Sequence, residues 1–595
     1  MTSASSVSTF LGVAKSALGR RWDLRRADDA SVTTLVREAG VSDAVARVLA
    51  ARGVDAMAAA DFLHPTLKVL LPDPSQLTDM DQAAARILAA VKSGEKIAVF
   101  GDYDVDGATS SALLMRFFRS IGVTVTVYIP DRRIEGYGPN APALLKLRQQ
   151  GAKIVITVDC GIVAFEALSA AKESGLDVIV VDHHKAEPMM PAAAAVVNPN
   201  RLDDASLQGH LAAVGVAFLL AVAVNRALRA DGWYAAQGVA EPDLRLLLDL
   251  VALGTVCDVV PLKGLNRAFV VRGLQVMARG GNVGLTALSR VARIDTKPTA
   301  YHLGYLLGPR VNAGGRIGQA DLGTRLLSTE DPDEAAALAL RLDEYNAARK
   351  EIEAAVLREA IEQVESKASD DPVIFAVGKD WHPGVIGIIA GRLRERYDRP
   401  ACVVALDGGM AKGSGRSIAG VDLGRAILGA REAGHLFTGG GHAMAAGFSV
   451  TEDKIDALVG FVQDEVRRQL QGEAFAPSMS LDGALAVSAV TADLVAELDC
   501  VSPFGAGNDE PRFAIVDANL VKVDIVGSGH VRCILSGRSG GRLKAIAFNC
   551  VDSDLGQLLL TGAGKRLHLA GTIRADTWQG RTEAQLIIED GAPSF

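Results

Sequence analysis

Short apolar segments alternate with amphipathic ones through the first half of the chain. The apolar segments are rich in Val and Ile and have the length of strands: residues 95–100, 123–130, 152–159, 176–182 and 192–199. The segments between the first four have helical spacing and cover residues 108–122, 141–151 and 162–175. Strands that are apolar on both faces are typical of a parallel sheet covered by helices. The pattern therefore predicts a parallel-sheet α/β lobe within residues 81–330, preceded by a helical lead-in over residues 1–80.

The middle of the chain is predicted to be helical. Residues 211–330 form a helical stretch that includes the glycine-rich segment GPRVNAGGRIG, and one long helix follows over residues 331–368. Asp331 is its expected N-cap, Pro332 its first residue, and Glu334 completes a capping-box pattern. About 36 helical residues span roughly 54 Å, so this helix is expected to bridge two lobes. Two helices separated by a break are the alternative.

The last part of the chain changes character twice. Residues 369–472 again alternate apolar strands with helices and predict a second α/β lobe. After the spacer GEAFAPS, residues 473–595 contain about five short strand-like runs between Gly and Ser turns. Such a pattern predicts a small C-terminal β-barrel of the OB type, a fold that commonly binds single strands.

Length and composition agree with several globular domains. The chain has 595 residues, 49% hydrophobic and 22% charged. No apolar run approaches the roughly 20 residues of a membrane span, and no signal peptide is recognised. Six cysteines without CxxC spacing favour a reducing, cytoplasmic setting without structural zinc. The net charge of −8 argues against coating nucleic acid by bulk charge, but it is compatible with a local basic groove.

Acidic residues follow the predicted strands. Asp102, Asp104 and Asp106 come after the first, Asp159 after another and Asp182-His183-His184 after a third; Asp258 ends a further hydrophobic run. The carboxyl ends of parallel strands form the site-bearing edge of α/β sheets. In extended backbone, residues two apart point the same way. Asp104 and Asp106 are thus expected to face one site, with Asp102 behind them.

Each acidic segment alone fits a solvated turn or a surface loop, but together they indicate a metal centre. Several carboxylates at one place raise one another's pKa, and divalent cations remove that repulsion. Carboxylates alone suit Mg²⁺, and added imidazole favours Mn²⁺ or another transition metal. The number of ligands suggests two ions, which would activate water and stabilise charge on a phosphoryl group. Hydrolysis of a phosphate ester or anhydride is the expected chemistry.

The motifs GDYDVDG, TVDCG, VVDHH and GTVCD resemble, in this order, the four motifs of the DHH phosphoesterase superfamily. The resemblance is closer to the RecJ single-strand-specific 5′-to-3′ DNA exonucleases, and it extends through FLHPTL, IPDRRIEGYG, GPRVNAGGR, WHPGVIGI, GSGRS, GGGHAMAAGF and PFGAGNDEPRF. One departure is NAGGR, where the family more usually has NAAGR. The resemblance implies that six residues are metal ligands with a catalytic role: Asp104, Asp106, Asp159, His183, His184 and Asp258. It implies that Asp102 and Asp182 support them.

Several residues are candidates for contacts with nucleic acid. Arginines in glycine-rich segments such as GPRVNAGGR and GSGRS, which are expected to be loop-like, suit phosphate contact because their guanidinium groups bind in a bidentate way. The resemblance implies a 5′-phosphate pocket at Ser414, Arg416 and Arg132, and backbone contacts at Arg310 and Arg316. The remaining candidates are Gly440 and His442 of the GGGH segment, Tyr137 and Trp381 for positioning or stacking, and Lys544, Arg574 and Trp578 as weak candidates on the barrel. Structural salt bridges and packing are the alternatives for all of them.

The expected function is a Mn²⁺- or Mg²⁺-dependent, two-ion 5′-to-3′ exonuclease that degrades single-stranded DNA to 5′-mononucleotides. The family implies a role in recombination and repair, with single-strand-binding protein and a RecQ-type helicase as partners, and a monomer is expected. Two alternatives stay open. One is a phosphodiesterase for short oligonucleotides or cyclic dinucleotides, or a pyrophosphatase; the other is a scaffold that has lost its metals.

Overall fold

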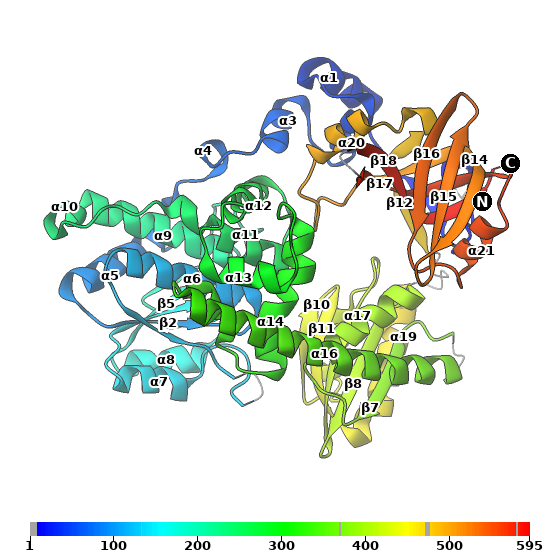
Figure 1. Cartoon of the computed structure of the whole chain (residues 1–595). Helices are drawn as coiled ribbons and strands as arrows, with labels where there is room; N and C mark the ends of the chain where they lie inside the picture. Colours follow the sequence, from blue (N-terminus) through cyan, green and yellow to red (C-terminus); the bar gives the residue numbers. More distant parts are fainter. Residues whose placement is uncertain (1–8, 132–133, 368–369, 471–476, 579–580, 595) are drawn as a thin grey trace, which may run out of the picture.

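The computed structural model describes residues 9–131, 134–367, 370–470, 477–578 and 581–594. It contains a sheet-and-helix lobe, a second α/β lobe and a C-terminal β-barrel, with the long helix α16 running from the first lobe along the second (Figure 1). This arrangement confirms the predicted fold class.

The first lobe is built on a five-stranded parallel sheet in the order β3-β2-β4-β5-β6. Its strands are β2 (Ile97–Gly101), β3 (Val125–Tyr128), β4 (Ile154–Val158), β5 (Asp177–Val181) and β6 (Ala195–Val197). One face packs on α5 (Met80–Ser93), α6 (Val105–Ser120) and α9 (Ala213–Ala230), and the other on α7 (Ala141–Gln149) and α8 (Phe165–Glu173). Because both faces are covered, β2 and β4 are buried along their whole length.

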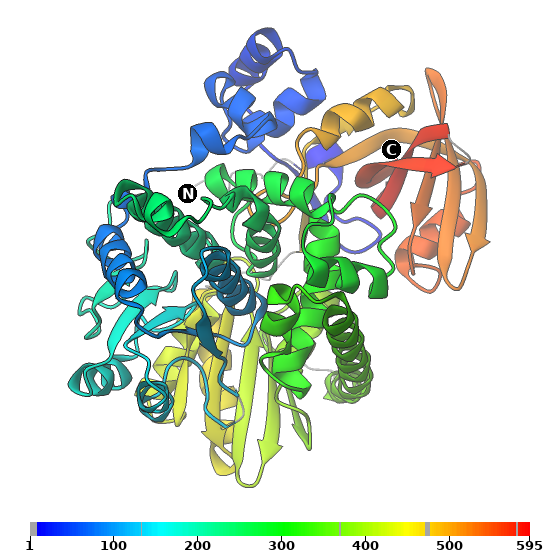
Figure 2. The same cartoon turned by 60° about the vertical axis from the view of Figure 1, so that its left-hand side comes forward.

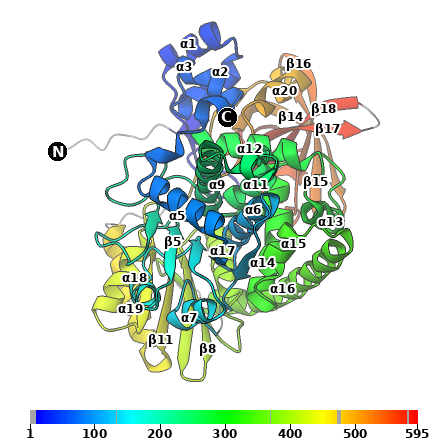
Figure 3. The same cartoon turned by 90° about the vertical axis from the view of Figure 1, so that its left-hand side faces the viewer.

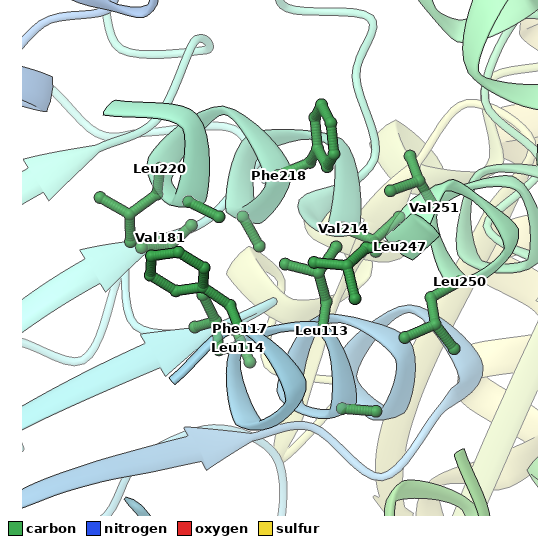
Figure 4. Close-up of a cluster of buried hydrophobic side chains, with 14 of the residues drawn as sticks. Leu113, Leu114, Phe117, Val181, Val214, Phe218, Leu220, Leu247, Leu250 and Val251 are labelled. Carbon is green, nitrogen blue, oxygen red and sulfur yellow. The ribbon is translucent and has the colours of Figure 1, made fainter. Parts of the chain in front are cut away.

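The larger core lies between the sheet and the helices above it. Leu113 and Phe117 of α6 meet Val214 and Phe218 of α9 in one apolar cluster (Figure 4). By length and composition α9 could cross a membrane, since its mean hydropathy is 1.6. However, 72% of that window is buried inside the lobe, as expected for the central helix of a core.

The rest of the first lobe is helical, as predicted. Its elements are α10 (Trp233–Gln237), η3 (Leu244–Leu247), α11 (Leu248–Cys257), α12 (Gly264–Met277), α13 (Val283–Val291), η4 (His302–Leu307), α14 (Gly308–Ile317) and α15 (Leu322–Ser328). The segment GPRVNAGGR was expected to be loop-like, and this was wrong. Its glycines allow close helix packing instead, since a Cβ at Gly315 would lie 2.8 Å from the Tyr103 carbonyl oxygen.

Helix α16 (Pro332–Lys367) is a single helix of 36 residues, as predicted, and not two. The Asp331 carboxylate accepts a hydrogen bond from the Asp333 amide at 2.9 Å and caps the helix. The predicted capping box is replaced by a relay. The Asp331 amide donates to the Thr329 hydroxyl, and that hydroxyl donates to Glu334 at 2.6 Å.

The second lobe has a mixed five-stranded sheet in the order β10-β11-β9-β8-β7. The strands are β7 (Ile374–Lys379), β8 (Ala401–Asp407), β9 (Met410–Arg416), β10 (Thr438–His442) and β11 (Ala445–Thr451); the helices are α17 (Ile386–Tyr397), α18 (Leu423–Glu432), η5 (Glu452–Lys454) and α19 (Ile455–Gln469). The segment GSGRS, expected to be loop-like, lies mostly in β9. The extended strand places its alternate side chains, including Ser414 and Arg416, on one face.

The C-terminal barrel closes in the order β14-β15-β16-β18-β17, with β17 pairing back to β14. Its strands are β14 (Arg512–Val526), β15 (His530–Gly537), β16 (Gly540–Ala547), β17 (Arg566–Trp578) and β18 (Arg581–Pro593), and α21 (Asp554–Leu560) lies between the third and fourth. A closed five-stranded Greek-key barrel is the OB-fold, as predicted. It is preceded by β12 (Ser478–Leu481), β13 (Gly483–Leu485), η6 (Val487–Ala489) and α20 (Ala492–Asp499).

The N-terminal segment packs on this barrel, although it is far away in sequence (Figures 2 and 3). It contains η1 (Phe10–Gly12), β1 (Arg21–Leu24), α1 (Asp29–Ala39), α2 (Asp43–Ala51), α3 (Ala56–Leu63), α4 (Leu67–Leu70) and η2 (Pro74–Gln76). The helical lead-in therefore includes one strand that the sequence did not indicate. Strand β1 pairs in parallel with β12, and α1 to α3 share a core with the barrel.

Candidate metal centre

The metal-ligand candidates lie at the carboxyl edge of the parallel sheet. Asp102 follows β2, Asp159 follows β4, and Asp182 with His183 follows β5. Asp159 adopts a left-handed backbone with φ of 61°, and its amide donates to the Val181 carbonyl. Asp and Asn tolerate this conformation better than most residues. The Asp159 carboxylate lies near those of Asp102 and Asp104.

The chain between Asp104 and Asp106 is not extended, contrary to the prediction. Asp104 is the N-cap of α6 and accepts hydrogen bonds from the amides of Asp106, at 2.9 Å, and Gly107, at 3.1 Å. The helix therefore begins before Asp106 and rotates its side chain away from that of Asp104. Asp102 was expected behind this pair, but one of its carboxylate oxygens lies within 4.8 Å of ligand atoms of Asp104 and Asp159.

Asp258 also reaches the site by a different route from the one expected. The hydrophobic run before it is helix α11, and Asp258 is the C-cap of that helix. A continuous apolar run is compatible with a buried helix as well as with a buried strand. Here the residues of α11 are buried on all sides, which removes the helical period from the sequence.

Three overlapping groups of side chains place their ligand atoms within 4.8 Å of one another. They are Asp102-Asp104-Asp159, Asp159-His183-His184 and Asp106-His183-Asp258. All six predicted ligands are thus brought together, and Asp102 joins them. Asp159 and His183 each belong to two groups, so they occupy the middle of the centre.

His183 points one ring nitrogen into the carboxylates. Its Nε2 lies 3.3 Å from Asp159 Oδ1, 3.6 Å from Asp258 Oδ2 and 3.9 Å from Asp106 Oδ2. The other nitrogen, Nδ1, is 3.1 Å from the Leu211 carbonyl oxygen, which requires Nδ1 to carry the proton. Burial lowers the pKa of His183 to about 4. A neutral ring with a free Nε2 lone pair is the form that ligates a metal.

Burial and mutual repulsion raise the pKa values of three of the carboxyl groups. Burial, followed by the charge of Asp104, raises the pKa of Asp106 to about 7. The pKa of Asp258 rises to about 9, first through burial and then through the charge of Asp106. The pKa of Asp159 is raised for the same reasons, burial first and Asp104 next. Without a cation, the centre therefore holds protons that ordinary carboxylates would lose.

A hydrogen-bond network orients the His183-His184 segment. Asp182 accepts from the amides of Ile162, His183 and His184, and from His184 Nδ1 at 2.7 Å. Burial alone would raise the pKa of Asp182, but the hydrogen bond and charge of His184 outweigh it and lower that pKa. Asp182 is thus an ionised anchor for the imidazole of His184. The Tyr137 hydroxyl donates to the Asp159 carbonyl oxygen at 2.8 Å.

Two asparagines of this network were not found from the sequence. Asn198 is fully buried and donates to the His184 carbonyl oxygen at 2.9 Å. Asn200 donates to the carbonyl oxygens of His183 and Gly209. Asn198 follows strand β6, so the rule that located Asp159 at a strand end would have located it too.

The donor set fits a divalent cation. Within the part of the chain that the structure describes, His183 Nε2 and Asp258 Oδ2 are buried and have no hydrogen-bond partner. Buried polar atoms are normally paired, and a cation between these two atoms would pair both. Oxygen ligands with one or two imidazoles suit Mg²⁺ and Mn²⁺.

The raised carboxyl pKa values predict that metal binding stabilises the protein more at high pH. Between about pH 4 and pH 9 the folded, metal-free protein holds more protons at Asp106 and Asp258 than the unfolded chain does, so its stability falls as pH rises. Cation binding replaces those protons. We expect the rise in Tm on adding Mn²⁺ to be larger at pH 8 than at pH 5.5, with each kcal/mol worth about 2–4 °C.

Differential scanning calorimetry of the intact chain, with and without Mn²⁺, measures this difference. In Asp258→Asn the dependence of the metal-free Tm on pH should become shallower, because one of the shifted carboxyls is gone. An equal Mn²⁺ shift at both pH values would contradict the prediction.

Predicted phosphate contacts lie where the second lobe meets this centre. Gly315 of α14 packs on Tyr103, next to Asp104, and the adjoining Arg316 donates from Nη1 to the Gly384 carbonyl oxygen at 2.8 Å. Gly384 leads into the first turn of α17. On the other side of that turn, a Cβ at Gly387 would lie 3.0 Å from Ser414 Oγ and 3.1 Å from Arg416 Nη2.

Ser414 and Arg416 are thus close to the N-terminus of α17, where backbone amides favour an anion. The Arg416 guanidinium donates to Ser414 Oγ at 3.1 Å, so the two side chains are held together. Gly440 and His442 lie on the edge strand β10 of the same sheet, with His442 exposed.

Other predicted nucleic-acid residues have structural roles. Trp381 is 5% exposed, packs over Gly378 and donates to Glu359 at 2.7 Å, so it is not available for stacking. Arg310 is in an ion pair with Asp343 at 2.8 Å and is largely buried against α16. These two findings share one cause. Sequence shows that a side chain is suited to a ligand, but not that the fold has already given it a partner.

The remaining nucleic-acid candidates either lie outside the described residues or are paired with acidic side chains. Arg132 and the side chain of Trp578 lie outside the described residues. On the barrel, Lys544 contacts Glu583 at 2.7 Å, and Arg574 makes a bidentate pair with Glu510 at 2.6 and 2.8 Å.

Comparison with known families follows the same division of the chain. A profile of the DHH family N-terminal domain matches residues 96–255, the DHHA1 domain matches residues 370–468, and the RecJ OB domain matches residues 481–590. The single-stranded-DNA-specific exonuclease RecJ of Bacillus subtilis is 36% identical over 580 residues, covering 96% of this chain and 71% of the relative. The chain belongs to the RecJ family.

Two further RecJ proteins match over nearly their whole length. The RecJ of Dickeya dadantii is 38% identical and that of Escherichia coli is 37% identical, each over 91% of this chain and 95% of the relative. Among solved structures, RecJ from Thermus thermophilus in complex with Mn²⁺ has a TM-score of 0.78 at 29% identity, over 95% of this chain and 78% of that one. The predicted resemblance to RecJ is therefore confirmed.

Proposed function

We propose that this chain is a metal-dependent exonuclease that degrades single-stranded DNA from the 5′ end and releases 5′-mononucleotides. The observation that supports the proposal is a series of contacts. It leads from Tyr103, beside Asp104, through Arg316 and the start of α17 to Ser414 and Arg416. Membership of the RecJ family supports the substrate, and RecJ structures with Mn²⁺ and with Mg²⁺ support the choice of metal.

The residues of the centre would have different roles in phosphodiester hydrolysis. Asp104, Asp106, Asp159, His183, His184 and Asp258 would hold two ions, with Asp102 as a further ligand. When bound, such ions lower the pKa of a water molecule and stabilise charge on the phosphoryl group. Asp182 keeps His184 in one orientation through its hydrogen bonds. His183 is fixed by the Leu211 carbonyl group, so its Nε2 stays directed at the ligands.

The second lobe would determine which phosphate reaches the metals. Arg416 and Ser414 bind a terminal 5′-phosphate, and Arg316 holds the backbone between that phosphate and the ligands. A bound terminal phosphate places the next phosphodiester at a fixed distance from it. This geometry favours release of one nucleotide at a time.

The alternatives fit the structure less well. A phosphodiesterase for dinucleotides has no obvious use for the OB barrel, which offers a surface for a longer strand. A scaffold without metals would not need the paired ligand groups, yet all six predicted ligands are present and converge. Both alternatives are therefore weaker than the exonuclease.

We also propose a cytoplasmic location, a monomeric state, and cooperation with single-strand-binding protein and a RecQ-type helicase in repair and recombination. All six cysteines are free thiols, which agrees with a reducing compartment. A nuclease for single strands needs a partner that opens duplex DNA, which is the reason for proposing the helicase.

The proposal is tested with one oligonucleotide labelled at its 5′ end and used alone or annealed to its complement. With Mn²⁺, we expect the labelled mononucleotide to be the first product from the single strand, much slower cleavage of a blunt duplex, and no cleavage with EDTA. A 3′-labelled strand should instead give a ladder of shortening products. Equal rates on single strand and duplex, or far faster cleavage of dinucleotides than of long strands, would exclude the proposed substrate.

A further inference from the structure

Two stacked tyrosines are exposed on the first lobe. Tyr301 is 58% exposed and Tyr305 71% exposed, and their ring centroids are 5.1 Å apart with an angle of 23° between the planes. His302 packs edge-on against Tyr301. Large aromatic rings are usually removed from water because they bury so much apolar surface. Here two of them form a flat surface that faces solvent.

The tyrosines lie on a helix that leads to the metal centre. Tyr305 is part of η4, a π-helical segment continuous with α14. Such segments are rare and are frequently found at functional sites. This helix packs on the end of α11 that carries Asp258, since a Cβ at Gly304 would lie 3.4 Å from Val256 and one at Gly308 would collide with the Cys257 sulfur.

The far end of the same helix reaches the segment that carries Asp102 and Asp104. Gly315 packs on Tyr103, beside Asp104. At about 1.5 Å per residue, the distance along the axis from Tyr301 to Gly315 is roughly 20 Å. The tyrosines lie at the opposite end of this helix from Gly315, and a strand leaving the site along the helix would pass over them.

On its other side the tyrosine pair is near the barrel. The pKa of Arg574 in β17 is raised mainly by its hydrogen bonds to Glu510, and Tyr301 is among the groups that contribute. Tyr301 is thus within electrostatic range of the OB-fold. The loop before the helix carries Arg293 and Lys297, which are exposed and form no ion pair with any described residue. Asp295 in that loop is near His302.

We infer that Tyr301 and Tyr305 form a stacking platform for bases of single-stranded DNA, between the metal centre and the OB barrel. Aromatic rings stack on any base and therefore bind without sequence preference. Arg293 and Lys297 provide the positive charge that attracts the phosphates of the same segment. The inference rests on the proposed nuclease function. It assigns to these residues the binding of the strand beyond the nucleotide that is cleaved.

The test compares the double variant Tyr301→Ala/Tyr305→Ala with Tyr301→Phe/Tyr305→Phe, which keeps both rings. Binding of a fluorescent single strand of about 30 nucleotides is measured by anisotropy in EDTA, so that no cleavage occurs. We expect the Ala pair to bind about 10- to 100-fold more weakly and the Phe pair to bind like wild type. Hydrolysis of a dinucleotide with Mn²⁺, which does not reach the platform, should be the same in all three proteins.

A second measurement locates the contact. A strand carrying 2-aminopurine at successive positions should show quenched fluorescence several nucleotides from the 5′ end in wild type, and this quenching should be lost in the Ala pair only. If the Ala pair bound the strand and quenched its fluorescence as wild type does, the inference would be overturned. The exposed tyrosines would then not bind DNA, and a protein partner would be the alternative occupant of this surface. The proposed function can fail independently of this inference. In that case wild type would cleave no single-stranded DNA, although the Ala pair would still bind the strand more weakly than wild type.

Discussion

Asp159→Asn is expected to abolish nuclease activity while making the metal-free protein more stable. Asp159 belongs to two of the three ligand groups, so its loss should reduce kcat by roughly 10³-fold or more. In the absence of metal, the same carboxylate is buried among like charges, and a neutral amide relieves that repulsion. We therefore expect a higher Tm in EDTA, a much smaller rise in Tm with Mn²⁺, and almost no product from a labelled single strand.

Asparagine is the informative substitution at this position. Asp159 has a positive φ, which Asn adopts readily but Ala adopts at a loss of about 1–2 kcal/mol. Asp398→Asn is a matched control, because Asp398 also has a positive φ, of 49°, and lies at the end of α17 outside the site. Asp398→Asn should keep wild-type activity and the full Mn²⁺ shift. If Asp159→Asn behaved like this control, Asp159 would not be a ligand.

Arg416→Ala is expected to remove the preference for a 5′-phosphate. Its guanidinium lies with Ser414 near the first turn of α17, and a charge-assisted contact to a phosphate contributes about 1.5–3 kcal/mol. We expect kcat/KM on a 5′-phosphorylated strand to fall about 10- to 100-fold. Activity on a strand with a 5′-hydroxyl should change much less, because it offers no terminal phosphate to the pocket.

Gly387→Ala tests the same pocket by narrowing it. The new Cβ would lie about as close to Arg416 Nη2 as to Ser414 Oγ, at 3.1 and 3.0 Å, and must displace one of them. It adds a good helix former to α17, so the lobe should fold. Gly391→Ala on the same helix is the control, since a Cβ there meets nothing within 4 Å. If Arg416→Ala and Gly387→Ala lowered kcat/KM equally on phosphorylated and unphosphorylated strands, this pocket would not bind the 5′-phosphate.

Sequence reasoning located the centre because strands are short and their ends are marked. Buried β-branched runs ended at Asp102, Asp159 and Asp182, and parallel strands bring such ends to one edge. The backbone conformation predicted at Asp106 was wrong. The capping hydrogen bonds of Asp104 start a helix one residue later, so Asp106 is helical and not extended. The acidic spacing of two residues suggested extended chain, whereas it reflects a cap and the first turn of a helix.

Contacts between distant segments were beyond the sequence. Nothing in the local pattern distinguishes Arg310, which Asp343 holds, from Arg316, which reaches Gly384. Tyr301 and Tyr305 were also missed, because two tyrosines four residues apart in a helix are equally compatible with a core. Only their exposure in the folded chain separates the two possibilities.

The contact between the N-terminal segment and the C-terminal barrel affects the order in which the protein folds during synthesis. Trp22 is fully buried and donates to Asp590 at 3.1 Å, and β1 pairs with β12. During synthesis, segments near the N-terminus emerge first and generally fold first. The indole of Trp22 instead stays exposed to water until residue 590 has left the ribosome. A nascent chain stalled before residue 590 should therefore expose Trp22, and the barrel is complete only after its last strand, β18, has been synthesised.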